Sequence, residues 1–328
     1  NKPKSKLHII IMINNILFKK FIIITIPTLS LLIGFLFDED LSTGGAKSDF
    51  LQIVPLISEL ANFKLENISN YTRHFPLHYL ILSIPQFIFS DILITKLVYL
   101  FFSLLIPIFL YLNLSKLYPN NEINNLIISF AIIFIPFFRA SAIWPNAHLT
   151  AIIFLIILNY FYLQFLEKRK KYFIFLKILF LSLSTYTMQS YVVFFLYFLY
   201  EYYKKNSFKN LIIILFFCFL LSIPGFYLIL DTSVSNKLAF TKNIPYTILT
   251  NSSIIFFFTL FFLFNKKNLE IIIDNLKKIK LNEHIILFIF ILFLYLNYEN
   301  STPNQGGGFF YIISFFIFNN NIIFNIIS

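Results

Sequence analysis

The sequence predicts an all-α polytopic membrane protein with about 10–11 apolar segments, whose first external loop contains a juxtamembrane amphipathic helix. Of its 328 residues 58% are hydrophobic and only 12% are charged, and the mean hydropathy is +0.78. A soluble domain carries about 25% charged residues, and a single core stops growing at about 250–300 residues. The composition therefore argues against a cytosolic enzyme, a nucleic-acid-binding protein and a disordered chain.

The whole chain, residues 1–328, is predicted to form a single transmembrane domain. It begins with Asn1 rather than Met and ends in an apolar run that starts at Phe309, so we expect a truncated C-terminus. The one cysteine, Cys218, lies in an apolar segment, which leaves neither a disulfide framework nor a cysteine metal site.

The net charge of +11 indicates topology rather than an anionic partner. Seventeen of the 26 Lys and Arg residues fall in four clusters, at 2–20, 168–171, 204–209 and 266–280. Because short loops rich in Lys and Arg stay in the cytoplasm, these clusters are placed inside.

With those clusters inside, the predicted spans follow in order along the chain. They are residues 21–37 leading out, 147–166 leading in, a hairpin of 172–183 with 191–203, a second hairpin of 211–230 with 254–264, then 285–296 and a segment from 309 onward. Residues 266–280 are too charged to span and predict an interfacial amphipathic helix.

Three apolar segments lie at 76–90, 92–117 and 126–138, where only an even number of crossings fits. One segment must therefore be short, broken or re-entrant. We expect this of 76–90, because it has only 15 residues and contains Pro76 and Pro85.

Five polar stretches then face outward, at 38–75, 139–148, 184–190, 231–250 and 298–308. The first of them holds six of the 15 acidic residues: Asp38, Glu39, Asp40, Asp49, Glu59 and Glu66. These acids either mark the solvated end of the first span or belong to a site. The uneven distribution favours a site at the external face.

Residues 49–65 have apolar side chains at helical spacing, which predicts an amphipathic helix on the membrane surface. Asp49 is then either the N-cap of this helix or a functional carboxylate. Gly44 and Gly45 come just before it and permit a tight turn.

Other side chains in the external stretches suit binding. Arg73, His74 and His78 lie at the mouth of the 76–90 segment and could bind phosphate. The stretch 139–148 contains Arg139, Asn146, His148 and the only tryptophan, and it is either a binding loop or an interfacial loop anchored by that Trp144. Gln189 lies at a hairpin tip where binding and a plain turn are equally consistent.

The acidic loop and the motif after it resemble the GT-C superfamily of membrane glycosyltransferases. The nearest branch is the bacterial families related to dolichyl-phosphate-mannose protein mannosyltransferases and aminoarabinose transferases. The matching stretch runs from Asp38-Glu39 to His74-Phe75-Pro76-Leu77-His78-Tyr79. It departs from those families in having His-Phe-Pro-Leu where His-Pro-Pro-Leu is commoner, and it offers two aspartates, Asp38 and Asp49, as the catalytic one.

The resemblance implies an inverting transfer of a sugar from a polyprenyl-phosphate carrier to a lipid, glycan or protein acceptor, at the outer face of a bacterial inner membrane. Asp49 or Asp38 would be the general base. Arg73, His74, Arg139 and His148 would hold the phosphate, and a divalent cation is either required or not. The remaining candidate substrate-binding residues are Glu39, Asp40, His78, Trp144, Asn146 and Gln189.

Two alternatives stay open. A transporter or flippase of lipid-linked glycans would show charges at mid-span and an internal repeat, and neither is evident. A polymerase or ligase of the O-antigen type would place its long, Arg-rich external loop late in the chain, whereas here the richest external loop comes first.

Overall fold

The computed structural model of the chain describes residues 3–42, 44–64, 75–168, 170, 172–192, 194, 195, 198, 208–230, 270, 274 and 289. The chain divides into two compact units, Asn1–Leu238 and Ala239–Ser328. All the elements below belong to the first unit.

The described residues form helices and no strand, which confirms the predicted all-α membrane protein. The helices are α1 (Pro3–Leu36), α2 (Gly45–Ala61), α4 (Leu77–Phe89), α5 (Ile92–Ser103), α6 (Leu105–Leu117), α7 (Glu122–Ala131), α8 (Pro136–Ile143), α9 (Ala147–Lys168), α10 (Tyr172–Thr187) and α12 (Phe208–Leu230). Short 3-10 turns, Ile132–Phe134 and Gln189–Val192, follow α7 and α10.

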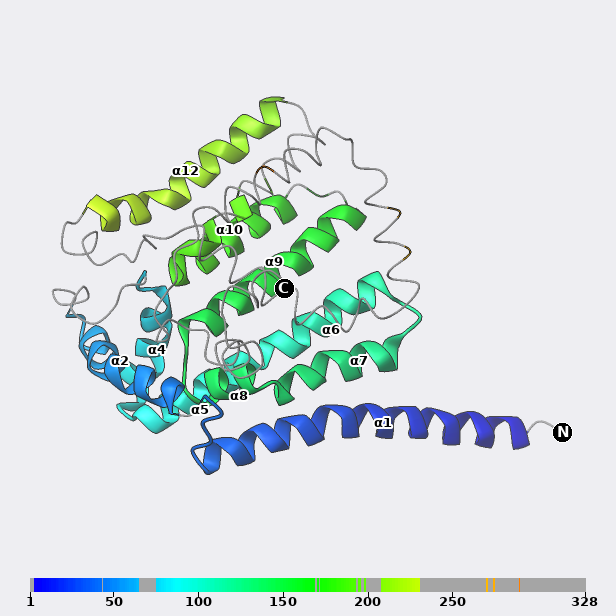
Figure 1. Cartoon of the computed structure of the whole chain (residues 1–328). Helices are drawn as coiled ribbons and strands as arrows, with labels where there is room; N and C mark the ends of the chain where they lie inside the picture. The colour runs from blue at the N-terminus through cyan, green and yellow to red at the C-terminus, as the bar shows by residue number, and fades with distance from the viewer. Residues whose placement is uncertain are drawn as a thin grey trace. The chain divides into compact units, whose positions relative to one another are not determined.

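The long helices lie in a row. α1 packs beside α7, α7 beside α6, α6 beside α9, α9 beside α10, and α10 beside α12 (Figure 1). α2 and α4 pack against each other near the C-terminal end of α1 (Figure 1). The main core joins these elements through fully buried side chains such as Leu31, Phe50, Tyr99 and Ile153.

In the described part of the chain, three helical stretches are long and apolar enough to cross a membrane: Leu17–Leu36, Ile92–Leu117 and Ala147–Lys168. Large apolar side chains remain exposed along them, for example Phe21 and Phe101. Exposed apolar side chains of this kind suit contact with lipid, whereas their contact with water would be unfavourable.

A fourth apolar stretch is broken, and it is either a bent span or a re-entrant segment. Glu122–Phe134 and Pro136–Ile143 meet at 65°. Ile135 takes an extended backbone (φ −69°, ψ 126°) because the ring of Pro136 disfavours the helical region for the residue before it. Pro136 then starts α8 at a position where its missing N–H costs nothing.

The segment predicted to be short, 76–90, forms the single helix α4 of 13 residues. Its length is about 20 Å, against the roughly 30 Å of a bilayer core. Its short length fits the parity argument, which leaves 92–117 and 126–138 as the two predicted crossings between residues 76 and 138. The break in the backbone lies elsewhere, in the segment predicted at 126–138.

The amphipathic helix after the first span exists as α2, but Asp49 is not its N-cap. α2 begins at Gly45, and its N-cap is Gly44 with φ +93°. Glycine takes this left-handed backbone without strain, so the helix can begin directly after the turn. Asp49 is the fifth residue of α2 and is exposed.

Two further expectations change. The stretch 139–148 is not an extended loop, because Arg139 to Ile143 belong to α8 and α9 starts at Ala147. Residues 184–187 belong to α10 rather than to a hairpin tip. The second segment of each predicted hairpin (191–203 and 254–264), the predicted helix at 266–280 and the polar stretch 298–308 lie outside the described residues, apart from a few positions.

Candidate functional site

The turn between α1 and α2 carries three successive carboxylates, Asp38, Glu39 and Asp40, which we call the acidic turn. It starts where α1 ends, and Asp38 takes a left-handed backbone with φ +51°. This sharp reversal directs three adjacent side chains to three different partners.

Glu39 forms a bidentate ion pair with Arg139 of α8. Arg139 Nε donates to Glu39 Oε1 at 2.6 Å, and Arg139 Nη2 lies 2.5 Å from Glu39 Oε2. The guanidinium also donates to the side chain and the carbonyl of Ser30 on α1, at 3.0 and 3.1 Å. Arg139 is 8% exposed, and this planar fork satisfies most of its donors. Its role is thus to tie α8 to the end of α1.

Asp38 pairs with a lysine that comes from inside an apolar helix. Lys96 Nζ of α5 lies 3.1 Å from Asp38 Oδ1 and 3.4 Å from the ring centroid of Trp144. The Lys96 side chain is 6% exposed, whereas that of Asp38 is 57% exposed. The lysine is therefore a buried support, and the carboxylate it holds is open to solvent.

Trp144 contacts residues of the acidic turn, α2 and α5, and it is 3% exposed. Its indole Nε1 donates to the Glu39 carbonyl at 3.1 Å, and its ring packs on Phe50 of α2 at 6.1 Å. Lys47 Nζ of α2 lies 4.9 Å from the same ring. Burial rules out the predicted interfacial anchor, because the indole contacts protein on its faces and its edge.

Asp40 serves α2. Its Oδ2 accepts from the Lys47 backbone N–H at 2.9 Å, and its Oδ1 accepts from the backbone N–H of Ser42 at 2.8 Å and from the Ser42 hydroxyl. Ser42 Oγ in turn accepts from the Ala46 N–H at 2.6 Å. Asp40 and Ser42 together satisfy two N–H groups of the first turn that the glycine N-cap leaves without a side-chain acceptor.

Their hydrogen-bond partners favour the ionised form of both Glu39 and Asp40. The hydrogen bond from Arg139 holds the pKa of Glu39 below its ordinary value, although partial burial acts in the opposite direction. Burial raises the pKa of Asp40, but the hydrogen bonds from the Ser42 hydroxyl and the Lys47 and Ser42 amides outweigh it, so the net pKa is also lowered. Neither group is suited to take up a proton near neutral pH.

A second polar network adjoins the first. His78 of α4 is fully buried, and its Nδ1 lies 2.9 Å from Thr150 Oγ1 of α9. Tyr99 of α5 contacts the same hydroxyl at 2.8 Å and donates to the Asn146 carbonyl at 2.9 Å. Asn146 Oδ1 accepts from the His148 N–H and so caps α9. Because Tyr99 follows Lys96 by one helical turn, α5 links the two networks.

The sequence-predicted residues thus divide into groups. Those brought together at the acidic turn are Asp38, Glu39, Asp40, Arg139 and Trp144, while His78 and Asn146 lie in the adjoining network. His148 is exposed on the first turn of α9, and Gln189 follows Met188, which packs on Ala147 and Ala151. Asp49 makes no ion pair within the described part of the chain. Arg73 and His74 lie outside the described residues.

Sequence reasoning missed Lys96, Lys47 and Ser30. The signal for Lys96 was available, because an ionisable residue inside an apolar segment marks a functional or structural partner by default. Its position near one end of the segment hid that signal. Lys47 and Ser30 carried none, since an exposed lysine and a serine in an apolar helix are common.

Among the described residues, no three His, Cys, Asp or Glu side chains converge as a metal ion would require. In the acidic turn, Glu39 and Asp40 already face Arg139 and the α2 amides. The described carboxylates therefore do not offer a three-ligand set for the divalent cation that the family resemblance allows.

The comparisons with known proteins add no relative to this geometry. No family model, no curated protein and no solved structure matches this chain.

Proposed function

We propose that this protein is a membrane glycosyltransferase that moves a sugar from a polyprenyl-phosphate carrier to a hydroxyl acceptor at the outer face of a bacterial inner membrane. The observation that carries the proposal is the exposed carboxylate of Asp38, held by a buried lysine. Its carboxylate is open, lies at the end of the first span and is supported from below by the buried Lys96.

The three acids of the turn receive different roles in this proposal. Glu39 and Asp40 have structural roles, because the Glu39 carboxylate is paired with Arg139 and the Asp40 carboxylate accepts hydrogen bonds from backbone amides such as that of Lys47. Asp38 has one oxygen toward Lys96 and more than half of its side chain exposed, so an acceptor hydroxyl can approach it. Asp49 is exposed as well, but none of the described ion pairs includes it, so the contact with Lys96 favours Asp38 over Asp49 as the general base.

The reaction is an inverting displacement. The acceptor O–H transfers its proton to Asp38 while the acceptor oxygen bonds to the anomeric carbon. The bond from that carbon to the phosphate oxygen breaks, and polyprenyl phosphate leaves with the electron pair. Because that leaving group is already a stable anion, it needs nearby cations rather than a proton donor.

Lys47 is the described cation best placed for the phosphate. It is exposed, it comes from the surface helix α2, and its Nζ lies over Trp144 beside Lys96. Arg139, predicted as a phosphate ligand, is instead used by Glu39 and Ser30. Arg73 and His74 remain candidates from the sequence.

The test uses the full chain purified in detergent and a panel of synthetic polyprenyl-phosphate hexoses, pentoses and aminosugars with a membrane glycolipid extract as acceptor. Free polyprenyl phosphate is quantified by mass spectrometry. We expect release by the wild type and a loss of about 100-fold or more in Asp38→Asn, the scale of a general base.

Glu122→Gln is the matched control, because it also removes a carboxylate paired with a lysine, Lys20, away from the acidic turn. Full activity of Asp38→Asn would refute the assignment, and a selective loss in Asp49→Asn would move the base to α2. A transporter of lipid-linked glycans would release no polyprenyl phosphate in detergent with any donor.

A further inference from the structure

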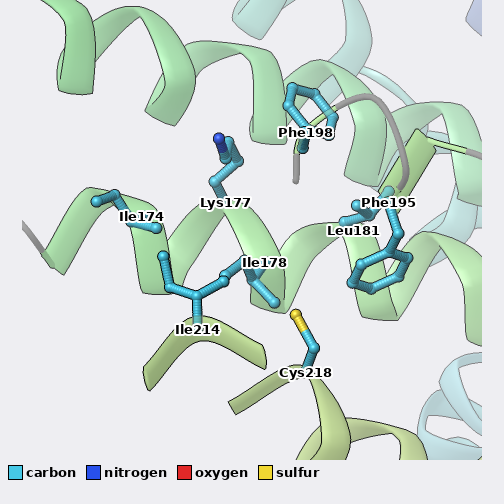
Figure 2. A pocket seen from close by; sticks show the side chains of 8 residues that line it. All are labelled: Ile174, Lys177, Ile178, Leu181, Phe195, Phe198, Ile214 and Cys218. Carbon is cyan, nitrogen blue, oxygen red and sulfur yellow. The ribbon is translucent and has the colours of Figure 1, made fainter. Parts of the chain in front are cut away.

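One face of α10 borders two neighbouring cavities on the side of α12. The larger, of about 210 Å³, is lined among others by Thr185 and Tyr186 of α10 and by Leu221 and Gly225 of α12. The smaller, of about 10 Å³, lies around Lys177 (Figure 2). Phe195 and Cys218 line both cavities, so the two hollows adjoin.

Tyr186 crosses from α10 into the backbone of α12. Its hydroxyl donates to the Leu221 carbonyl at 2.5 Å and accepts from the Gly225 N–H at 2.9 Å. In an unbroken helix that N–H would donate directly to that carbonyl, because the two are four residues apart. The tyrosine hydroxyl therefore hydrogen-bonds to both backbone groups of one rung of the α12 hydrogen-bond ladder.

The sequence of α12 prepares this contact. Pro224 lies inside the helix and has no N–H to give the Leu220 carbonyl, so the rung before this one is already missing. Gly225 leaves room for the hydroxyl, since a Cβ there would lie 3.3 Å from Tyr186 Oη. Inserted side chains and prolines are the usual causes of a bend in a helix.

We propose that Tyr186 is a latch that holds α12 against α10 and thereby controls access to the cavity between them. Two arrangements of α12 satisfy the same backbone groups. In one the Tyr186 hydroxyl bridges Leu221 and Gly225, and in the other these two residues bond directly and Tyr186 is released. Elements with two alternative packings are what switching proteins use.

The apolar setting makes the alternation possible. In hydrocarbon an unsatisfied backbone group is costly, so a helix loses its bridging hydroxyl only if the direct bond forms in its place. Here the direct bond can form at once, because both of its partners lie in α12. Releasing Tyr186 therefore removes the tie between α10 and α12 without leaving the Leu221 and Gly225 groups unpaired.

The chain supplies its own reporter. Cys218 is the only cysteine of the sequence, and it lines both cavities. Figure 2 shows its side chain pointing from α12 toward Ile178 of α10. The rate at which a membrane-permeant maleimide alkylates this thiol measures access to the space between the two helices.

The experiment compares that rate, followed by intact-protein mass spectrometry in nanodiscs, in the wild type and in Tyr186→Phe. We expect alkylation about tenfold faster in the variant, a change in open population that corresponds to about 1.4 kcal/mol. The matched control is Tyr111→Phe, which removes another hydrogen-bonded tyrosine hydroxyl, at Glu122, and should keep the wild-type rate.

An unchanged or slower rate in Tyr186→Phe, or an equal acceleration in Tyr111→Phe, would overturn the proposal. If Tyr186→Phe does not fold, Pro224→Ala decides in the same way. It restores the N–H that the ladder lacks, favours the direct bonds of α12 and should also accelerate alkylation. The readout needs no sugar transfer, so it stands or falls independently of the proposed function.

Discussion

Gly34 shows how one residue without a side chain allows the site to form. A Cβ at this position would lie 2.7 Å from Arg139 Nη2 and would also overlap the Glu39 carboxylate. The ion pair that joins α8 to the turn therefore passes through the space that a larger residue on α1 would fill. Nothing in the sequence around Gly34 distinguishes it from a glycine that is simply tolerated in an apolar helix.

We predict that Gly34→Ala separates Glu39 from Arg139 and lowers the free energy of unfolding by about 1–3 kcal/mol, the usual range for disrupting a partly buried charged network. Thermal unfolding of the purified chain in detergent measures the loss. Gly45→Ala is the control, because its nearest neighbour, Ser42 Oγ, would be at an ordinary 3.4 Å. Equal melting temperatures for both variants would contradict this account of Gly34.

Lys96 illustrates a charge whose meaning only packing reveals. In the sequence it is a single lysine near the end of an apolar segment, where a long side chain can reach the interface. In the structure its ammonium group lies under Trp144 and contacts Asp38. A buried ammonium with one carboxylate partner and an aromatic face is well compensated, and it fixes that carboxylate in place.

At the scale of a single element, α2 begins without a capping side chain at its N-cap. Asp40 and Ser42, four and two residues before Gly44, supply the acceptors instead. The turn folds back because Gly44 takes a left-handed backbone. Asp40 thus couples the acidic turn to the surface helix that carries Lys47.

We predict that Asp40→Ala and Ser42→Ala each destabilise the start of α2 by about 1 kcal/mol, as loss of a helix cap does. Hydrogen exchange at the Ala46 and Lys47 amides should become several times faster in both variants. Because Asp40 also accepts from Ser42, the double variant should cost less than the sum of the two. Unchanged exchange at both amides would contradict the capping role.

The bend between α7 and α8 arises from a short sequence signal. The extended Ile135 before Pro136, which follows the 3-10 turn Ile132–Phe134, marks the point where the fourth apolar stretch turns by 65°. The bend places Arg139 on the short helix α8, and Trp144 at its C-cap, beside the end of α1. A straight helix would have carried Arg139 along the axis of α7, away from Glu39.

At the scale of the whole molecule, ion pairs lie near both ends of the long helices, measured along their axes. Lys20 pairs with Glu122 and Lys116 with Glu167, where the first span starts and where α6 and α9 end. Asp38 with Lys96 and Glu39 with Arg139 lie at the opposite end. Basic residues 168–171 follow the first end, so that end is predicted to be cytoplasmic.

We predict opposite accessibility for two engineered cysteines in a Cys218→Ser background. Leu41→Cys, at an exposed position in the acidic turn region, should react with an impermeant maleimide in intact cells. Asn120→Cys, exposed between α6 and α7, should react only after the cells are permeabilised. The reverse pattern would place the proposed site in the cytoplasm and refute a reaction at the outer face.

Part of the site can also be predicted from the sequence. The residue types and the common side of Asp38, Glu39, Arg139 and Trp144 predict that they share a site, and the structure brings them together. The same reasoning includes Asp49 as an N-cap or a site residue, but α2 begins four residues earlier and Asp49 is an exposed residue inside the helix. The roles of the three adjacent acids were beyond reach, since each depends on a partner from a different helix.

Composition, hydropathy and charge asymmetry by themselves determined that this chain is an all-α membrane protein, roughly where its described spans lie and that acids are concentrated after the first of them. These properties are local or additive, so a sequence shows them. Only the tertiary structure decided that Lys96 supports Asp38, that Arg139 occupies Glu39 and that Tyr186 enters α12. Each of these contacts joins groups far apart in the chain, and their pairing depends on how the helices pack.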